Sequence, residues 1–386
     1  MRMPLNVWLL MAAQALNQCC APMVVLVGGL IGAKLAPLPQ LVTLPVALMV
    51  VGTALATMPV SLSMQRWGRK RVFLSGNVLA MIGALLAAWA LHAESFWAFC
   101  AGALLLGSSL ALVQQYRFAA MESVPLDMMP QAASRVLLAG LVAAFIGPEL
   151  GVRGQHLLGT EYMGSFLSLI VLNACALGLL LMVRDVGVQS AHTAGSGRSM
   201  RRIMAQPVFW TAVGAGAVGY AMMSFIMTAT PVSMHVMEGH NLADTKWVIQ
   251  SHIMAMFLPS LLSGWLIAQF GIGRLMFIGC VVYLVCIAVA SRGIALPNYW
   301  IGLVLLGIGW NFLFVSGTAL LPRCYKDEER FRVQGFNEFI VFGTQAVASL
   351  TSGWVLSGLG WENLLLLCVP LVCVQLFLLL IWRRSS

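Results

Sequence analysis

Long apolar stretches alternate with short polar breaks along the whole chain. A helix needs about 20 residues to cross a bilayer, and each apolar stretch is long enough for one crossing. The pattern therefore predicts membrane-spanning helices. We expect twelve spans, at residues 6–33, 38–64, 72–92, 96–122, 132–152, 162–183, 207–235, 246–269, 274–291, 298–322, 334–357 and 362–382.

One longer polar stretch, which contains HTAGSGRSMRR, divides these spans six and six. It predicts three regions: a six-helix bundle at 1–184, a cytoplasmic linker at 185–206 and a second six-helix bundle at 207–386. The first apolar stretch has little basic n-region and no convincing cleavage site. We therefore interpret it as the first span and not as a signal peptide.

Composition supports an all-α membrane protein. Hydrophobic residues make up 60% of the 386 residues and charged residues only 9%, whereas soluble domains are about 25% charged. The mean hydropathy is +0.90. The net charge of +9 does not indicate nucleic-acid binding, because the basic residues lie in short runs between apolar stretches.

The basic residues also predict the orientation. With both termini in the cytoplasm, seventeen of the 22 Lys and Arg residues fall on the cytoplasmic side and four on the outer side. Only Arg117 then lies within a span. Short cytoplasmic loops are enriched in Lys and Arg, so this imbalance favours a multi-pass protein of the inner membrane with both ends inside.

The two halves resemble each other when the chain is shifted by 203 positions. The shift places Gly68 on Gly271, Gly76 on Gly279 and the first span on the seventh. Weak internal repeats of this kind are common in transporter folds.

The loop after the second span reads SLSMQRWGRKR. It resembles the loop signature of the major facilitator superfamily through Arg66, Gly68, Arg69 and Lys70. Gln65 stands where that family usually has an aspartate; it can donate and accept hydrogen bonds but carries no charge for an ion pair. The fifth span contains Gly147, Pro148 and Gly151, which resemble a glycine–proline signature of the superfamily's exporters. Proline bends a helix and small residues allow close packing, so this segment is a candidate hinge.

The resemblance implies a fold of two pseudo-symmetric six-helix bundles around a central cavity lined by spans 1, 4, 7 and 10. It also implies a secondary active transporter that works by alternating access. Two bundles that enclose one cavity can work as a monomer.

Polar residues inside the spans are the candidate site, because burying them in lipid is costly and they usually face protein or water. They fall on three spans that the resemblance places at the cavity. We expect Arg117 to contact either an anionic substrate group or a coupling carboxylate; pairing with Glu122 is the structural alternative. The other amides and the tryptophan could equally be packing groups. The predicted cavity residues are Gln14, Asn17, Gln18, Gln114, Arg117, Trp310, Asn311 and, in span 8, His252.

Proton coupling requires a titrating group in a partly desolvated place. Glu149 in the fifth span is the best-placed carboxylate, although it could simply cap the outer end of its helix. No nucleotide-binding loop, hydrolase triad or zinc spacing occurs in the sequence. We therefore expect no enzyme activity, no cofactor and no metal, and we interpret the 23 methionines as apolar filler.

The leading hypothesis is proton-coupled efflux of a small organic solute, that is, an antiporter. Uptake of a metabolite or vitamin by the same fold is the alternative. A membrane sensor or an intramembrane enzyme is the remote alternative, since no cluster of His, Asp and Glu is evident at a membrane face.

The topology predicts that a reporter fused after Ser386 is active only when the reporter works in the cytoplasm. Two fusions at this position, one to a reporter active in the cytoplasm and one to a reporter active in the periplasm, measure on which side the C-terminus lies. Activity of the periplasmic reporter would contradict the even number of spans.

Overall fold

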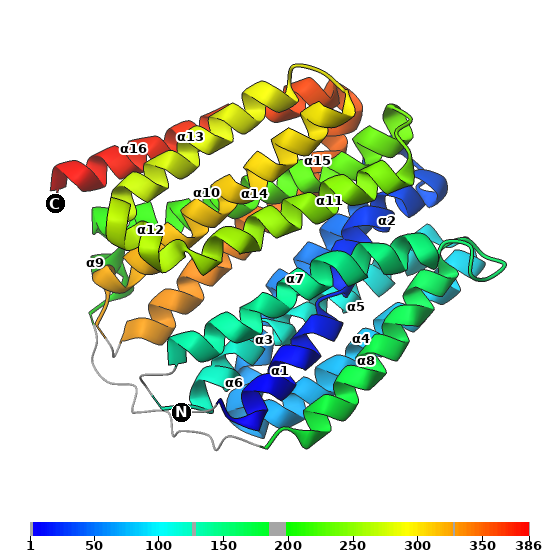
Figure 1. Ribbon diagram of the computed structural model, residues 1–386, viewed down its shortest axis with the longest axis horizontal. Helices are drawn as coiled ribbons and strands as arrows, with labels where there is room; N and C mark the ends of the chain where they lie inside the picture. The colour runs from blue at the N-terminus through cyan, green and yellow to red at the C-terminus, as the bar shows by residue number, and fades with distance from the viewer. Residues whose placement is uncertain (1–2, 126–128, 185–197, 327–328, 386) are drawn as a thin grey trace. The chain divides into compact units, whose positions relative to one another are not determined.

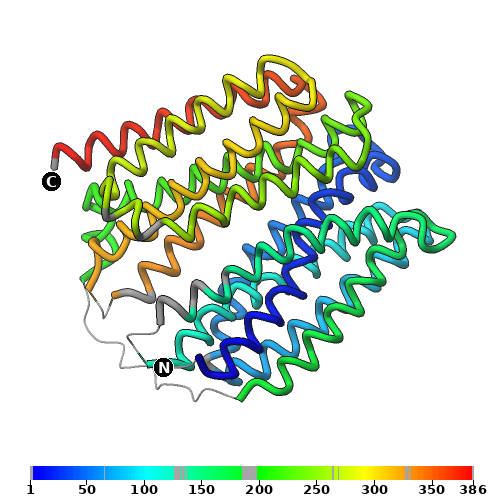
Figure 2. The backbone as a smooth tube through the Cα atoms, viewed as in Figure 1, coloured from blue at the N-terminus to red at the C-terminus, as the bar shows by residue number. Residues whose placement is uncertain are grey.

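The computed structural model describes residues 3–125, 129–184, 198–326 and 329–385, and every regular element in these ranges is a helix (Figure 1). The chain forms two compact units, Met1–Ser190 and Ala191–Ser386. Helices run along one another within each unit (Figure 2). Gln65, where the sequence departs from the family's loop signature, lies outside the described side chains.

Unit 1 contains eight α-helices and a 3-10 turn in its described residues. The first span packs against α7 and α8, while α5 packs against α3 and α4. The elements are α1 (Leu5–Asn17), α2 (Cys20–Leu35), the 3-10 turn Pro39–Leu41, α3 (Leu44–Trp67), α4 (Arg69–His92), α5 (Phe96–Val113), α6 (Tyr116–Glu122), α7 (Met129–Arg153) and α8 (Met163–Met182).

Unit 2 is built around α10, which contacts α14, α15 and α16. Its described elements are α9 (Met200–Met204), α10 (Pro207–Pro231), the π-helical turn Val232–Met237, α11 (Leu242–Phe257), the 3-10 turn Leu258–Leu261, α12 (Ser263–Phe270), α13 (Ile272–Ala290), α14 (Leu296–Leu320), the 3-10 turn Leu321–Cys324, α15 (Arg330–Leu366) and α16 (Val369–Ser385).

The helices account for the twelve predicted spans. Nine segments of the described residues are long and apolar enough to cross a membrane. One of them, Arg332–Arg384, has 53 residues and would be about 80 Å long as a single helix. It breaks at Gly360, where φ is 80°, and so supplies spans 11 and 12. Helix α7 is span 5, and α11 with α12 forms span 8.

The predicted repeat is visible in two glycine turns. Gly68 joins α3 to α4 with φ 80° and ψ 157°, and Gly271 joins α12 to α13 with φ 76° and ψ 155°. Residues with a Cβ rarely adopt this conformation. The two positions are 203 residues apart, as the sequence shift requires, so the corresponding loops of the two halves have the same backbone shape.

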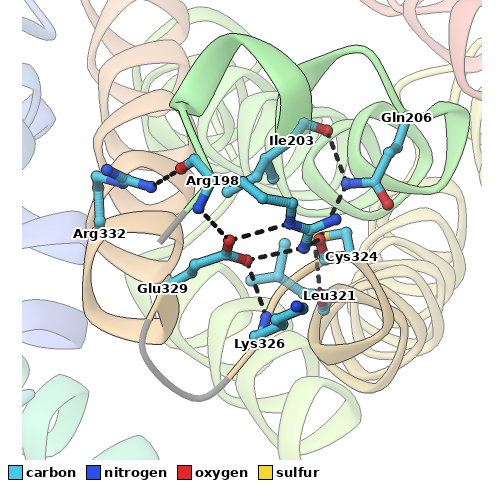
Figure 3. Close-up of polar contacts among 8 residues, drawn as sticks. All are labelled: Arg198, Ile203, Gln206, Leu321, Cys324, Lys326, Glu329 and Arg332. Atoms are coloured by element: carbon cyan, nitrogen blue, oxygen red, sulfur yellow. Dashed lines mark hydrogen bonds and ion pairs between the residues drawn. The ribbon is translucent and has the colours of Figure 1, made fainter. Parts of the chain in front are cut away.

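Part of the predicted linker is a structured element of unit 2. Residues 185–197 lie outside the described residues, whereas Arg198 is held against the segment before α15 (Figure 3). The Arg198 guanidinium donates to the Glu329 carboxylate from Nη2 (2.7 Å) and Nε (3.0 Å). The backbone N–H groups of Arg198 and Lys326 donate to the same carboxylate, at 2.7 and 2.9 Å.

The other hydrogen bonds around Arg198 and Glu329 go to backbone carbonyl groups. Arg198 Nη2 and Gln206 Nε2 both donate to the Cys324 carbonyl, each at 3.0 Å, and Arg332 donates to the Arg198 carbonyl (Figure 3). The Glu329 side chain is fully buried. The hydrogen bonds from Arg198, followed by the one from the Lys326 N–H, lower the pKa of Glu329 from 4.5 to about 2. This clamp fastens the end of the linker to unit 2.

We predict that Glu329→Gln lowers the unfolding temperature of the solubilised protein by a few degrees near neutral pH, because Arg198 loses its charged partner. The pKa of Glu329 is lower in the folded protein, so its stabilisation is complete above about pH 4.5 and declines as the pH falls toward 2. The difference between wild type and Glu329→Gln should therefore shrink through that window. Tryptophan fluorescence during heating measures it.

The matched control is Glu362→Gln, because Glu362 is exposed at the start of the last span. This variant should unfold with the wild type at every pH. A difference for Glu329→Gln that stays constant down to pH 3 would show that the carboxylate charge does not hold the clamp.

Candidate functional site

The first span is interrupted at the polar residues that the sequence singled out. Helix α1 ends at Asn17 and α2 begins at Cys20. Pro22 explains the break, because it has no N–H to donate to the Gln18 carbonyl and its ring crowds that group. The Ala21 N–H donates to the Gln18 carbonyl instead, at 3.2 Å. The Cys19 thiol donates to the Ala15 carbonyl at 3.1 Å.

The break connects to the fourth span through Tyr116. This span is itself divided, with α5 ending at Val113 and α6 beginning at Tyr116. The Tyr116 hydroxyl accepts hydrogen bonds from Asn17 Nδ2 (2.9 Å) and Asn77 Nδ2 (3.3 Å). Three elements, α1, α4 and α6, therefore meet at one buried hydroxyl. A small pocket adjoins it, and Asn17, Asn77, Ser109, Tyr116 and Asn173 are its polar lining residues.

Four amide oxygens of unit 1 are buried and have no hydrogen-bond partner among the described residues. They belong to Gln14, Asn17, Gln18 and Asn77. A buried acceptor without a donor is unfavourable by about 1–3 kcal/mol, so such groups usually meet water or a ligand. All four are neutral acceptors, which makes this region suited to a solute with hydroxyl or N–H donors.

Sequence reasoning found part of this region. It selected Gln14, Asn17 and Gln18, and it did not select Asn77 or Asn173. The signal for both was available, since each is an asparagine within an apolar span.

Arg117 lies one residue beyond Tyr116 in α6, and its guanidinium is 4.8 Å from the Phe118 ring centroid. Its predicted structural partner, Glu122, receives a bidentate pair from Arg69, with Nε–Oε2 at 2.7 Å and Nη2–Oε1 at 2.5 Å. Gln114 follows the end of α5 and is half-buried.

The loop signature ties together the ends of three helices of unit 1. Gly68 makes the turn, Arg69 bonds Glu122 at the end of α6, and Lys70 Nζ donates to the Leu181 carbonyl at the end of α8 (2.8 Å). Cations at helix C-termini are favoured by the helix dipole. Arg66 is exposed beside the Trp67 ring.

The glycines of the fifth span pack against the broken first span. A Cβ on Gly147 would lie 2.6 Å from the Cys19 carbonyl oxygen, and one on Gly151 would lie 3.0 Å from the Val27 side chain. The small residues thus let α7 approach the break closely. Pro148 lies inside α7. Glu149 accepts a 2.8 Å hydrogen bond from Arg153 and is 33% exposed.

In unit 2, Asn311 stabilises the interruption of the eighth span. Pro259 follows the end of α11 and removes a backbone donor. From α14, Asn311 Nδ2 donates to the Met256 carbonyl (2.7 Å) and to Ser260 Oγ (2.5 Å). Asn311 therefore has the packing role that the sequence analysis kept as an alternative. Its Oδ1 has no partner among the described residues.

His252 and Trp310 each keep one polar atom unused. His252 is fully buried and its Nδ1 bonds the Leu303 carbonyl at 2.7 Å, while Nε2 has no described partner. Trp310 is 4% exposed, stacks on Phe314 and has no described acceptor for its indole N–H. Ser316 Oγ and Gln375 Oε1 are further unpartnered atoms of this unit in the described residues.

The described residues contain no group of three or more His, Cys, Asp and Glu side chains that could hold a metal ion. Seven of the nine cysteines are buried as free thiols, and Cys175 and Cys373 are exposed. The polar sites of both units are therefore built from amides, hydroxyls and aromatic nitrogens.

Comparison with known proteins gives sequence relatives along the whole chain. The family described as "Major Facilitator Superfamily" matches this chain over residues 7–291 and 218–386. The riboflavin transporter RfnT of Brucella anthropi is 39% identical over 374 residues, covering 96% of this chain and 94% of the relative. The uncharacterized MFS-type transporter YdeG of Bacillus subtilis is 27% identical over 379 residues, covering 94% and 87%.

Solved structures agree in fold. A bacterial homolog of the human lysosomal transporter Spinster, inward-facing and occupied, has a TM-score of 0.72 at 13% identity, covering 98% of this chain and 96% of that one. The human organic anion transporter MFSD10 also has a TM-score of 0.72 at 13% identity, covering 97% and 100%. The chain belongs to the Major Facilitator Superfamily, and it is a multi-pass membrane transporter of small molecules, not an enzyme.

Proposed function

We propose that this chain transports riboflavin, or a close structural relative of it, by alternating access. The observation that carries the proposal is the 39% identity to a riboflavin transporter over 96% of the chain. Identity at this level extends through both six-helix halves. The relatives of known structure share only 13% identity and support the fold alone.

The chemistry of the spans supports a neutral solute. Riboflavin is uncharged near neutral pH and combines a flat ring system with a chain of hydroxyl groups. In unit 1, the unpartnered oxygens of Gln14, Asn17 and Gln18 could accept hydrogen bonds from such hydroxyls. We propose that these amides contact the solute, with Gln114 and Arg117 on the neighbouring span.

We propose uptake as the direction. The sequence analysis preferred efflux because Gly147, Pro148 and Gly151 resemble an exporter signature, and it kept vitamin uptake as the alternative. The similarity to a riboflavin transporter favours that alternative, since riboflavin is a vitamin. The glycines have a packing role beside the first-span break in either direction. Location in the inner membrane with cytoplasmic termini, and function as a monomer, remain part of this proposal.

We further propose that protons drive the transport. Glu149 is the coupling candidate from the sequence, and its carboxylate is paired with Arg153 at the end of α7. Protonation would break this pair within α7, the helix that packs against the first-span break.

Purified protein in liposomes should accumulate radiolabelled riboflavin when an inward proton gradient is imposed, and a protonophore should abolish the accumulation. Glu149→Gln should lose gradient-driven accumulation and retain exchange of labelled for unlabelled riboflavin. Accumulation without any effect of the gradient would overturn coupling alone.

The same vesicles report the direction and the substrate. Gradient-driven loss of preloaded riboflavin would support efflux instead of uptake. Absence of both flux and exchange, with monodisperse protein in the vesicles, would reject riboflavin as the solute.

Gln14→Leu should raise the KM for riboflavin about two- to tenfold, because one neutral hydrogen bond to the solute is lost. The thermal stability should stay equal or rise, because Gln14 Oε1 has no partner among the described residues. Flux titrations and unfolding curves measure the two effects.

Asn363→Leu is the control for this variant, since Asn363 is exposed in unit 2 and donates to the nearby Leu359 carbonyl. Its KM should equal that of the wild type. An unchanged KM in Gln14→Leu, together with lost stability, would assign Gln14 to packing.

A further inference from the structure

Five aromatic side chains form one cluster in unit 2, and we refer to it as the aromatic cluster. It brings together α10, the end of α11, α14 and the first part of α15. Its members are Tyr220, Phe257, Trp310, Phe314 and Phe342.

The centre of the cluster is a parallel stack. Trp310 and Phe314 lie four residues apart on α14, which places them on the same helix face. Their ring centroids are 4.9 Å apart and their planes differ by 12°. Tyr220 meets both rings edge-on, at 5.2 and 5.5 Å, and Phe257 meets Trp310 edge-on at 6.2 Å. The arrangement offers flat faces bordered by ring edges.

The cluster differs from an ordinary packed core in its exposure. Trp310 is buried, whereas Tyr220, Phe257, Phe314 and Phe342 are each half-buried. The rings around the central tryptophan therefore keep part of their surface open.

The indole N–H of Trp310 gives a second, independent observation. Buried Tyr and Trp groups normally find a hydrogen-bond partner, and other buried ones in unit 2 do so. Tyr283 donates to the Gly219 carbonyl (2.9 Å), Tyr299 bonds Ser233 (2.6 Å) and Trp361 donates to the Ala290 carbonyl (3.3 Å). Trp310 Nε1 is buried and has no acceptor within the described part of the chain.

We propose that the aromatic cluster binds the isoalloxazine ring of the transported flavin. This inference rests on the proposed function and assigns a part of the substrate to named residues. A flat tricyclic ring can stack on the half-buried Phe314 and meet the half-buried Tyr220 edge to face, because the planes of these two rings differ by 80°. Its carbonyl oxygens and ring nitrogens are acceptors that match the unused N–H of Trp310. The ribityl chain is not needed for either contact.

The test uses the full-length purified protein with riboflavin and with lumiflavin, which has the same ring system and a methyl group in place of the ribityl chain. Both ligands should bind, and their fluorescence should be quenched, because Trp and Tyr side chains in contact with a flavin quench it. Ribitol, the chain without the ring, should not displace lumiflavin.

Three variants separate the contributions. Trp310→Phe keeps a ring but removes the indole N–H, and Phe314→Leu removes one stacking face at a half-buried position. Each should weaken lumiflavin binding about five- to tenfold, and Trp310→Phe should also reduce the quenching of the bound flavin. Trp354→Leu is the matched control, because Trp354 is 62% exposed on α15 and outside the cluster.

The outcomes are distinct for the two proposals. If monodisperse wild type binds neither flavin, the proposed function and the ring site both fail. If riboflavin binds but lumiflavin does not, or if Trp310→Phe and Phe314→Leu bind lumiflavin as tightly as Trp354→Leu, the ring site alone is rejected. Weaker lumiflavin binding in both variants, with unchanged binding in Trp354→Leu, supports it.

Discussion

The hydrocarbon core of a membrane offers no hydrogen-bond partner to the peptide backbone, so each span must satisfy its own N–H and C=O groups. Continuous helices meet this requirement without help. Where proline interrupts a span, another group must replace the missing donor. The Cys19 thiol bonds the Ala15 carbonyl next to the break before Pro22, and Asn311 bonds the Met256 carbonyl next to Pro259. Three of the candidate site residues, Asn17, Gln18 and Asn311, lie at or beside these helix breaks.

This constraint bears on the amides of Asn17 and Asn311, which are held by hydrogen bonds and still have an unused oxygen. An amide has donors and an acceptor, and the contacts that hold these side chains use only the donors. Asn17 donates to Tyr116 and Asn311 donates across to span 8, yet the oxygen of each amide has no described partner. An amide that lies at a helix break and is held through its N–H donors thus also presents an unused acceptor at the same place.

The sequence was sufficient for the features that depend on period and composition. It predicted the twelve spans and the equivalence of Gly68 with Gly271. It could not predict which partner a side chain selects across the fold. Glu122 is bonded by Arg69, 53 residues away, and Glu329 by Arg198, 131 residues away. These ion pairs depend on which helix ends lie next to each other in the fold, and a single sequence does not reveal such tertiary contacts.

The division between charged and neutral groups bears on how a transporter can release its solute. Ion pairs such as Arg69–Glu122, Lys34–Glu161 and Arg198–Glu329 lie at helix ends and loops, where each joins segments of one unit. The unused polar atoms within the spans are mainly neutral amides, a hydroxyl and ring nitrogens. Neutral hydrogen bonds are each worth only about 0.5–1.5 kcal/mol net. A solute held by a few of them, and by ring stacking, gains enough to be selected and still dissociates on the other side of the membrane.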